Sequence, residues 1–196
     1  MTSQLKAKLL QHFAGKKKAN GGFTLIELLV VIIIIGILSA IALPSFLNQA
    51  NKAKQSEAKT YIGSMNRAQQ AYFMENGKMA PQERIAQLGL GIETETNNYK
   101  YSISANSTDS FVLQRAEPVS TSLKAYAGGV ETSTVGSGGN VEATTVAKLC
   151  EAILPPVGNG PDGTSDAVAT YFVGLDGVKG ATEFDCKVDT FKNLGA

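Results

Sequence analysis

The longest hydrophobic segment of the chain runs from Phe23 to Leu43, and Glu27 is the only charged residue among its twenty-one positions. As an α-helix with a rise of 1.5 Å per residue, it would be about 31 Å long, which matches the hydrocarbon thickness of a bilayer. The run of isoleucines at 32–35 would also suit a buried strand. The length of the segment and the lysines that precede it favour the helix. The pattern therefore predicts a membrane-spanning helix at 23–43.

After Pro44 the hydrophobic pattern takes the 3.6-residue period of an amphipathic helix. Apolar or small residues recur on one face, at Leu47, Ala50, Ala53, Ala58, Tyr61, Ile62, Met65, Ala68, Tyr72 and Phe73. We expect this half to end at Glu75-Asn76-Gly77, because glycine readily adopts the left-handed cap conformation and Pro81 follows shortly after. Pro44 removes one backbone hydrogen bond and is expected to kink or locally melt the helix. A second helical half is therefore predicted at 44–77, with its tyrosines and Phe73 in the core.

After a polar loop at 78–98, short runs in which apolar and polar residues alternate predict a small sheet. Three antiparallel strands are expected, at 99–105, 111–113 and 123–127. The Gly-, Ser- and Thr-rich segment 131–145 is expected to be a solvated connection, 144–153 a short helix or turn, and 168–173 a further strand. The predicted fold class is α+β, in which a long N-terminal helix packs on a small antiparallel β-sheet head that comprises residues 78–196.

Composition and charge narrow the possible functions. The chain has 196 residues, of which 43% are hydrophobic and 18% charged, so it is too apolar to be disordered and suits a single globular domain. Every charged residue in 1–22 is basic: Lys6, Lys8, Lys16, Lys17 and Lys18. A chain that begins at Phe23 would keep thirteen basic residues against seventeen acidic ones, a formal charge of about −4. Scattered basic residues without interleaved aromatics argue against sequence-specific nucleic-acid binding.

The residue types offer little for catalysis. The single histidine, His12, lies in the N-terminal leader. Two cysteines, Cys150 and Cys186, are too few for a structural zinc site. In an exported chain they suit one disulfide, with a pair of inert buried thiols as the alternative. The Asp-Gly pairs at 162–163 and 176–177 suit turns better than a calcium loop. We therefore expect a protein that is not an enzyme and that has no metal or cofactor.

Two targeting signals fit the N-terminus. The lysines place it in the cytoplasm by the positive-inside rule, with the chain after residue 43 exported. In the first signal, Ala40-Ile41-Ala42 is an ordinary signal-peptide site, and a soluble binding domain would be released after Ala42. In the second, the cut lies between Gly22 and Phe23, and the apolar helix is retained. The second is favoured, because an ordinary signal peptide needs neither the carboxylate of Glu27 nor so long a polar leader.

The junction Gly21-Gly22-Phe23-Thr24-Leu25-Ile26-Glu27-Leu28-Leu29-Val30-Val31 closely resembles the class III signal of type IV prepilins. The resemblance implies that an aspartyl prepilin peptidase cuts after Gly22 and N-methylates Phe23. It also implies that the apolar helix first anchors the precursor in the membrane and later forms the filament core. Pro44 lies at the usual distance from the cut in this family, and the resemblance implies that it has a part in assembly. The long leader is most similar to that of the major pilins of cyanobacteria.

For Glu27 the resemblance implies a role in assembly. Its carboxylate would lie about one helical turn, roughly 6 Å, from the new N-terminus. Because a desolvated carboxylate is costly unless it is paired, the implied partner in a filament is the charged amine of Phe23 on a neighbouring subunit. This pair would set the axial register of the filament. In the membrane we expect Glu27 to face the N-terminus of its own helix, where the helix dipole favours an acid.

In pilins a C-terminal disulfide bounds the surface-exposed region of the head, and the resemblance implies that a bridge between Cys150 and Cys186 is its counterpart. The expected architecture is a leader at 1–22, a transmembrane and filament-core helix at 23–43, an amphipathic half at 44–77 and a head at 78–196. The apolar half of the helix is expected to project, and the amphipathic half to pack on the head.

The function implied by the resemblance is that of the major structural subunit of a type IV pilus, a retractable surface fibre used for motility, adhesion and DNA uptake. The implied partners are the prepilin peptidase, other copies of the chain, and the pilus assembly platform with its ATPase. The implied location is the inner membrane and then the extracellular pilus. The nearest alternatives are a pseudopilin of a type II secretion system and a minor pilin.

Overall fold

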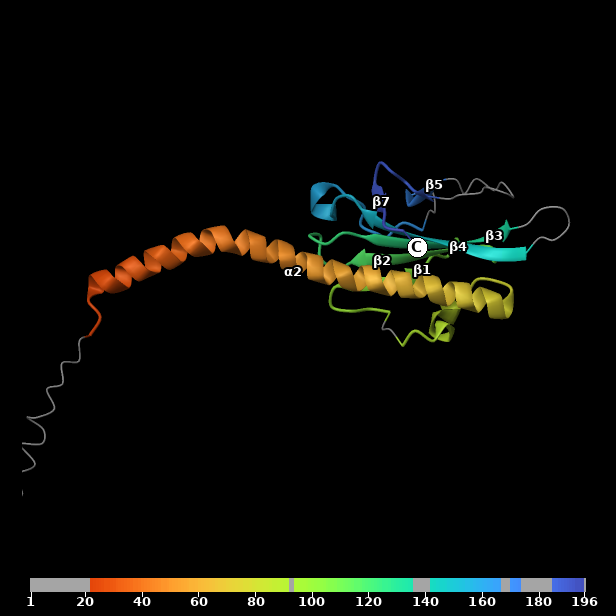
Figure 1. The fold of residues 1–196 in the computed structure, drawn as a ribbon, viewed down its shortest axis with the longest axis horizontal. Coiled ribbons are helices and arrows are strands. Elements are labelled where there is room, and N and C mark those ends of the chain that lie inside the picture. The colour runs from red at the N-terminus through yellow and green to blue at the C-terminus, as the bar shows by residue number, and fades with distance from the viewer. Residues whose placement is uncertain (1–21, 92–93, 136–141, 167–169, 174–184, 196) are drawn as a thin grey trace, which may run out of the picture. The chain divides into compact units, whose positions relative to one another are not determined.

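A computed structural model describes residues 22–91, 94–135, 142–166, 170–173 and 185–195 of the chain (Figure 1). The chain divides into two compact units, Met1–Leu47 and Asn48–Ala196. The elements are helix α2 (Leu25–Asn76), the 3₁₀ helices η1 (Gln82–Leu88) and η2 (Pro156–Gly158), and strands β1 (Tyr99–Ile103), β2 (Phe111–Pro118), β3 (Tyr126–Val135), β4 (Glu142–Ala152), β5 (Phe172–Val173), β6 (Asp185–Cys186) and β7 (Phe191–Asn193). The predicted α+β fold class is confirmed.

Helix α2 covers both predicted helical halves and includes Pro44 without a break in helical structure, so the local melting considered for this proline does not occur. The helix ends at Asn76, as predicted. Gly77 follows with φ of +70° and donates its N–H to the carbonyl of Phe73, which is the expected left-handed cap. Of the aromatic residues predicted for the core, Tyr72 is buried, and the other two, Tyr61 and Phe73, are partly buried against the core.

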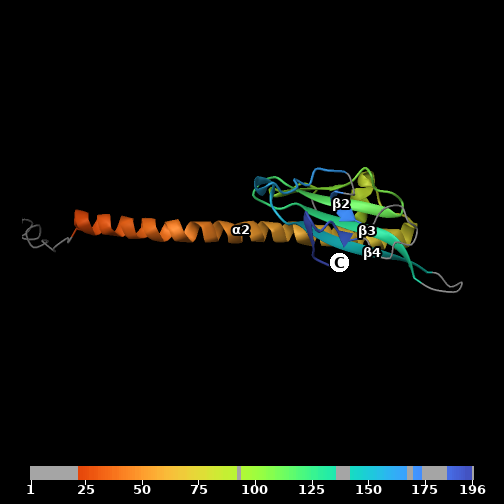
Figure 2. The same ribbon diagram turned by 90° about the horizontal axis from the view of Figure 1, so that it is seen from above.

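Five strands form an antiparallel sheet in the order β1-β2-β3-β4-β7, and β5 pairs with β6 in a separate ribbon. The half of α2 that belongs to the second unit runs alongside this sheet (Figure 2). Strands β1 and β2 lie where the sequence predicts them, although β2 continues to Pro118. Strand β5 falls within the predicted segment 168–173, of which 168 and 169 lie outside the described residues.

The prediction for 123–153 is wrong in three respects. The third strand starts at Tyr126 rather than at residue 123, and it continues to Val135. The described parts of the expected solvated connection are strand residues, and the expected short helix or turn at 144–153 is almost entirely strand β4. The reason is tertiary, because β3 and β4 pair over ten residues each, from Tyr126↔Glu151 to Val135↔Glu142. Such pairing outweighs a Gly-, Ser- and Thr-rich composition.

The sheet carries a hydrophobic core on each face. Residues Ile62 and Met65 of α2 pack with Tyr99, Val112 and Tyr126 of the strands in the first core. The second core contains Leu113, Tyr171, Phe172 and Phe191 together with both cysteines. Alternation along the strands explains this division, since Val112 and Leu113 point to opposite faces. The sequence pattern predicts the first core, whereas the second depends on segments that are distant along the chain.

Polar side chains from α2 reach across the first core. Asn66 is 3% exposed and donates its Nδ2–H to the carbonyl of Lys148 at 3.0 Å. It also accepts a hydrogen bond at Oδ1 from Nε2 of Gln114, at 3.1 Å. The fully buried Gln69 forms two hydrogen bonds, both of 2.9 Å, with the backbone N–H and carbonyl of Ala80. These bonds fix the second half of α2 on the sheet and hold the chain that follows it.

Candidate processing and assembly site

The first turn of α2 contains the residues of the predicted processing site. Thr24 donates its backbone N–H and its hydroxyl to Oε2 of Glu27, at 2.8 Å and 2.9 Å. Glu27 donates its own backbone N–H to Oγ1 of Thr24 at 3.3 Å. This reciprocal arrangement is a capping box, which satisfies backbone donors that have no partner within the helix. In the uncut chain, therefore, Glu27 is bound at the start of its own helix.

The geometry places Glu27 where we expect it before assembly. The nitrogen of Phe23 is an amide as long as Gly22 precedes it, so the charged amine that the resemblance implies as a partner exists only after cleavage. The role of Glu27 in setting the register of a filament stays a prediction. Thr24 is not among the predicted site residues, although the pattern Thr-x-x-Glu at the start of an apolar run is a recognisable signal for such a box.

Gly22 and Phe23 are both exposed ahead of the helix, and Phe23 is 82% exposed. A Cβ built on Gly22 would meet no heavy atom within 4 Å. The structure described for this chain therefore gives no packing reason for glycine at this position. Any requirement for glycine must come from a protein that binds the junction, and cleavage and methylation at this site stay predictions.

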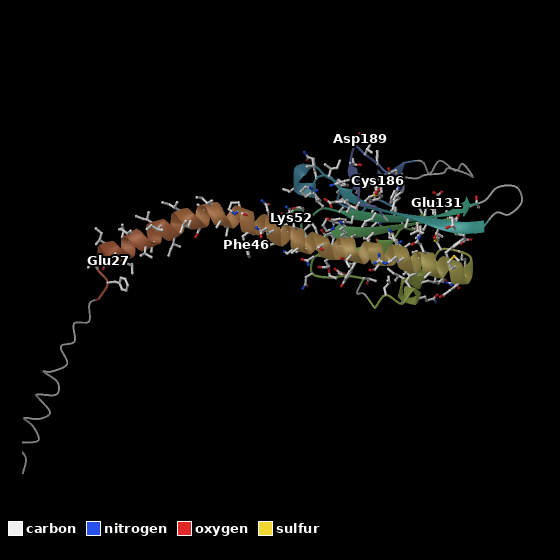
Figure 3. The ribbon with its side chains drawn as sticks, in the orientation of Figure 1. Glu27, Phe46, Lys52, Glu131, Cys186 and Asp189 are labelled. Atoms are coloured by element: carbon white, nitrogen blue, oxygen red, sulfur yellow. A yellow bond between two sulfur atoms is a disulfide. The ribbon has the colours of Figure 1, made fainter. Side chains whose placement is uncertain are left out.

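The apolar half of α2 has almost no cover in the described part of the chain. Residues 25–47 are exposed throughout, and this part of the helix is apolar enough to cross a membrane while none of it is buried. Side chains from Glu27 to Phe46 stand away from the ribbon in Figure 3. The length and composition of this segment allow it to span a membrane. Left in water, such a surface would aggregate, so it needs either lipid or other protein around it.

Small residues interrupt the apolar surface, and Gly36 is the clearest case, because a Cβ built there would meet nothing within 4 Å. Helices in lipid associate through close packing at small residues rather than through a hydrophobic driving force. The surface around Gly36 is thus available for another helix to approach closely. Pro44, also predicted to matter for assembly, lies inside α2, and its role in assembly stays a prediction.

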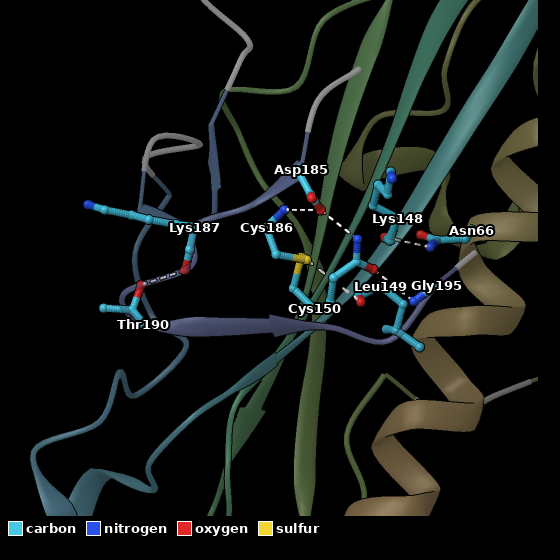
Figure 4. The surroundings of a disulfide bond; sticks show 10 residues. Asn66, Lys148, Leu149, Cys150, Asp185, Cys186, Lys187, Thr190 and Gly195 are labelled. Atoms are coloured by element: carbon cyan, nitrogen blue, oxygen red, sulfur yellow. Dashed lines mark hydrogen bonds between the residues drawn. A yellow bond between two sulfur atoms is a disulfide. The ribbon is translucent and has the colours of Figure 1, made fainter. Parts of the chain in front are cut away.

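Cys150 of β4 and Cys186 of β6 form a disulfide in the second core (Figure 4). Both cysteines are at most 1% exposed. Next to the bridge, Oδ1 of Asp185 accepts hydrogen bonds from the backbone N–H of Cys186 and from Nδ2 of Asn193. The expected C-terminal region bounded by a disulfide is therefore present, and the bridge fastens it to the far face of the sheet.

Glu57 fastens the start of β1 to α2. Its carboxylate accepts hydrogen bonds from Oγ1 of Thr96 at 2.6 Å, Nδ2 of Asn98 at 2.7 Å and the hydroxyl of Tyr101 at 3.3 Å. Partial burial acts to raise the pKa of Glu57, but these hydrogen bonds outweigh it and hold the pKa below its usual value. Burial and the charge of Glu57 both raise the pKa of Tyr101, so its hydroxyl stays a donor.

No cluster of metal-ligating side chains occurs among the residues that the structure describes. Asp162, from one of the Asp-Gly pairs, instead accepts hydrogen bonds from the backbone N–H and hydroxyl of Thr164, which is a local turn. The other pair, at 176–177, lies outside the described residues. The most exposed apolar surface of the described chain is the first half of α2.

Comparison with known proteins supports this picture. Residues 55–167 match the family described as Type IV pilin-like G and H, and residues 17–43 match the prokaryotic N-terminal methylation motif. No solved structure matches the chain.

Three curated relatives show how far the similarity extends. The type IV major pilin protein PilA of Myxococcus xanthus is 41% identical over 98 residues, which are 50% of this chain and 43% of that protein. The type IV wide pilus major component PilA4 of Thermus thermophilus is 33% identical over 92 residues, 47% of this chain and 70% of that protein. The type II secretion system core protein G of Aeromonas hydrophila is 33% identical over 69 residues, 35% of this chain and 48% of that protein. The residues of this chain that match thus span less than half of the length of the Myxococcus xanthus protein.

The model of the pilin family matches more than half of the chain. The N-terminal motif, the exposed apolar helix and the α+β head agree with that match. This chain therefore belongs to the type IV pilin family.

Proposed function

We propose that the chain is the precursor of the major structural subunit of a type IV pilus. The observation that carries this proposal is the contrast between the two parts of α2. The part within the second unit is seated on a sheet that has a core on each face, whereas residues 25–47 remain exposed. A polymer whose centre is a bundle of such helices would cover the exposed part without any change in the head.

Processing would convert the precursor into this subunit. A prepilin peptidase cuts between Gly22 and Phe23, removes the leader 1–22 and methylates Phe23. The free amine then becomes available to Glu27 of a neighbouring copy, while Thr24 holds the carboxylate until that exchange. The exposed junction and the open space around Gly22 support this step.

The remaining segments have separate roles in this proposal. Residues 23–43 anchor the precursor in the inner membrane and later line the filament core, and 44–77 and 78–196 form the packed half of α2 and the head. A membrane-bound assembly platform with its ATPase lifts the subunit out of the bilayer, and the fibre is extracellular. The protein has no catalytic role, and the fibre serves motility, adhesion and DNA uptake.

The N-terminus of natural material tests the proposal. Intact-mass and N-terminal analysis of protein from the cell surface should find methylated Phe23 as the first residue. A chain that begins at Leu43 would instead identify a soluble domain released after Ala42, and the pilus proposal would fall.

A pseudopilin of a type II secretion system is the second candidate, because the relatives include proteins named type II secretion system core protein G, from Aeromonas hydrophila and Vibrio cholerae. The disulfide that bounds the C-terminal region favours a pilin. Fibres sheared from cells separate the two. This chain should be the dominant band in the sheared fraction, and its absence would favour a pseudopilin or a minor pilin.

A further inference from the structure

A polar groove of about 580 Å³ opens between α2 and the loops at one end of the sheet. Lys52 and Lys59 line it from α2, and Ser122, Lys124 and Pro155 line it from the loops and the sheet end. Figure 3 labels Lys52 at this end of the sheet. The processing site does not use this groove, and of the core residues Tyr126 reaches its wall.

The groove carries a net positive charge. Lys124 is neutralised by Glu151, which also lines the groove, through an ion pair of 2.9 Å. Lys52 and Lys59 are exposed and have no ion pair with any described residue. They lie two helical turns apart and so share one face of α2. The groove is therefore positive in a chain that would have a formal charge of about −4 after loss of its leader.

Exposed apolar side chains lie beside this groove. Leu154 is 51% exposed and Val157 is 70% exposed, on either side of Pro155, which lines the groove. Val157 donates its backbone N–H to the carbonyl of Thr121 at 3.0 Å, which holds the η2 turn next to Ser122. Lysines beside exposed apolar side chains are the combination that binds the interface of an anionic membrane.

We propose that this surface, formed by Lys52, Lys59 and the η2 turn, docks on an anionic phospholipid bilayer. The groove takes lipid phosphates, and Leu154 and Val157 enter the headgroup layer. Position along the chain favours this occupant, because Lys52 follows the membrane-spanning segment proposed at 23–43 by only nine positions. Docking does not depend on fibre formation, so it would also hold for a minor pilin or a pseudopilin.

Contact between the η2 turn and lipid can be measured directly. The full chain carrying Val157→Cys is labelled with a polarity-sensitive fluorophore, and the native cysteines do not react because they form a buried disulfide. The labelled protein is reconstituted into vesicles of phosphatidylcholine alone and into vesicles that also contain phosphatidylglycerol. We expect a blue shift of the emission in the second vesicles, and high salt should reverse it.

Charge variants test the groove. Each lysine near an anionic surface raises the equilibrium constant for docking by a factor of about 5. The double variant Lys52→Gln with Lys59→Gln should therefore lower the equilibrium constant for docking on vesicles that contain phosphatidylglycerol about 30-fold. The matched control, Lys78→Gln with Lys192→Gln, removes the same charge away from the groove and should keep the shift. Equal shifts in both vesicle types, no shift in either, or an unchanged response of the groove variant would each overturn the proposal. Loss of the phosphatidylglycerol-dependent shift on addition of millimolar glycerol phosphate, at constant ionic strength, would assign the site to free phosphate and overturn membrane docking.

Discussion

Asn66 of α2 lies directly over Gly128 of β3, so closely that a Cβ built on this glycine would come within 2.4 Å of the Asn66 Oδ1 atom. The same Cβ would lie 2.6 Å from Cγ2 of Ile62. Any residue other than glycine would therefore displace the side chains of Asn66 and Ile62. It would also disturb the hydrogen bonds by which Asn66 joins Gln114 to the carbonyl of Lys148.

Gly128→Ala should lower the free energy of unfolding of the head by about 2 kcal/mol, because overpacking of a tight contact has a cost of this size. Denaturant unfolding of the full chain in detergent, followed by tyrosine near-ultraviolet circular dichroism, measures it. Gly63→Ala is the matched control, since the nearest atom to its Cβ is Nη1 of Arg67 at 3.8 Å. The control should gain about 0.5–1 kcal/mol from helix propensity. Equal effects of the two substitutions would contradict the close contact at Gly128.

Glu57→Gln should destabilise the head at neutral pH and should matter less in acid. The folded-state pKa of Glu57 is held below its usual value of 4.5, so its ionised form contributes stability that is fully present above this value. That contribution is lost as the pH falls through the folded pKa. Melting temperatures of wild type and variant should therefore differ at pH 7 and converge in acid, once the pH is below the folded pKa. A difference that does not change with pH would show that the charge of Glu57 has no part in holding Thr96 and Asn98.

Removal of the disulfide by Cys150→Ala with Cys186→Ala should lower the free energy of unfolding by up to about 4 kcal/mol, the chain-entropy value for a loop of this length. The same denaturant titration measures it. In the folded wild type, both sulfurs are buried, so a mild reductant should act only at the rate of unfolding. Rapid reduction under native conditions, followed by mass change after alkylation, would show that the bridge is accessible.

Gly22→Val should leave an uncut precursor in the membrane, because the family motif requires glycine before the cut. No heavy atom lies within 4 Å of the Cβ position, so the variant should fold normally and the defect should be confined to cleavage. Immunoblotting of membrane fractions shows whether the leader remains. Normal processing of this variant would remove Gly22 from the assigned site.

Glu27→Val should permit membrane insertion and cleavage but impair fibres, because the neighbouring amine of Phe23 would lose its partner. Thr24→Val separates this role from helix capping. It removes the hydroxyl that binds Glu27 and should weaken the first turn by about 1 kcal/mol, yet fibres should still form. Electron microscopy of sheared fractions measures both. Fibres at wild-type abundance in Glu27→Val would rule out a register role for this carboxylate.

The long helix α2 follows closely from the sequence. The period of the apolar residues and the glycine at position 77 locate α2 and its end, because these signals depend on near neighbours alone. Strand β4 was not predictable in this way. Its residues mix small, apolar and charged side chains without a long regular alternation, and they become a strand through pairing with β3. The second core also escapes local patterns, because it joins Phe172 and Phe191 to Leu113 across long stretches of chain.

The candidate site was likewise only partly predictable from the sequence. The sequence motif locates Gly22, Phe23 and Glu27, but the bonding of Glu27 to Thr24 was recognised only in the structure. The basic groove at Lys52 and Lys59 was not visible in the sequence, because the loops that complete it lie more than sixty positions away. Surfaces that assemble from distant segments need the fold before they can be recognised.

The two-sided sheet has a consequence for how this protein can evolve. The helix-side core and the disulfide-side core share only the strand backbones, so residues such as Tyr171 and Phe191 can be exchanged without moving α2. The disulfide side of the head can therefore accumulate substitutions while the seat of α2 on the sheet is preserved.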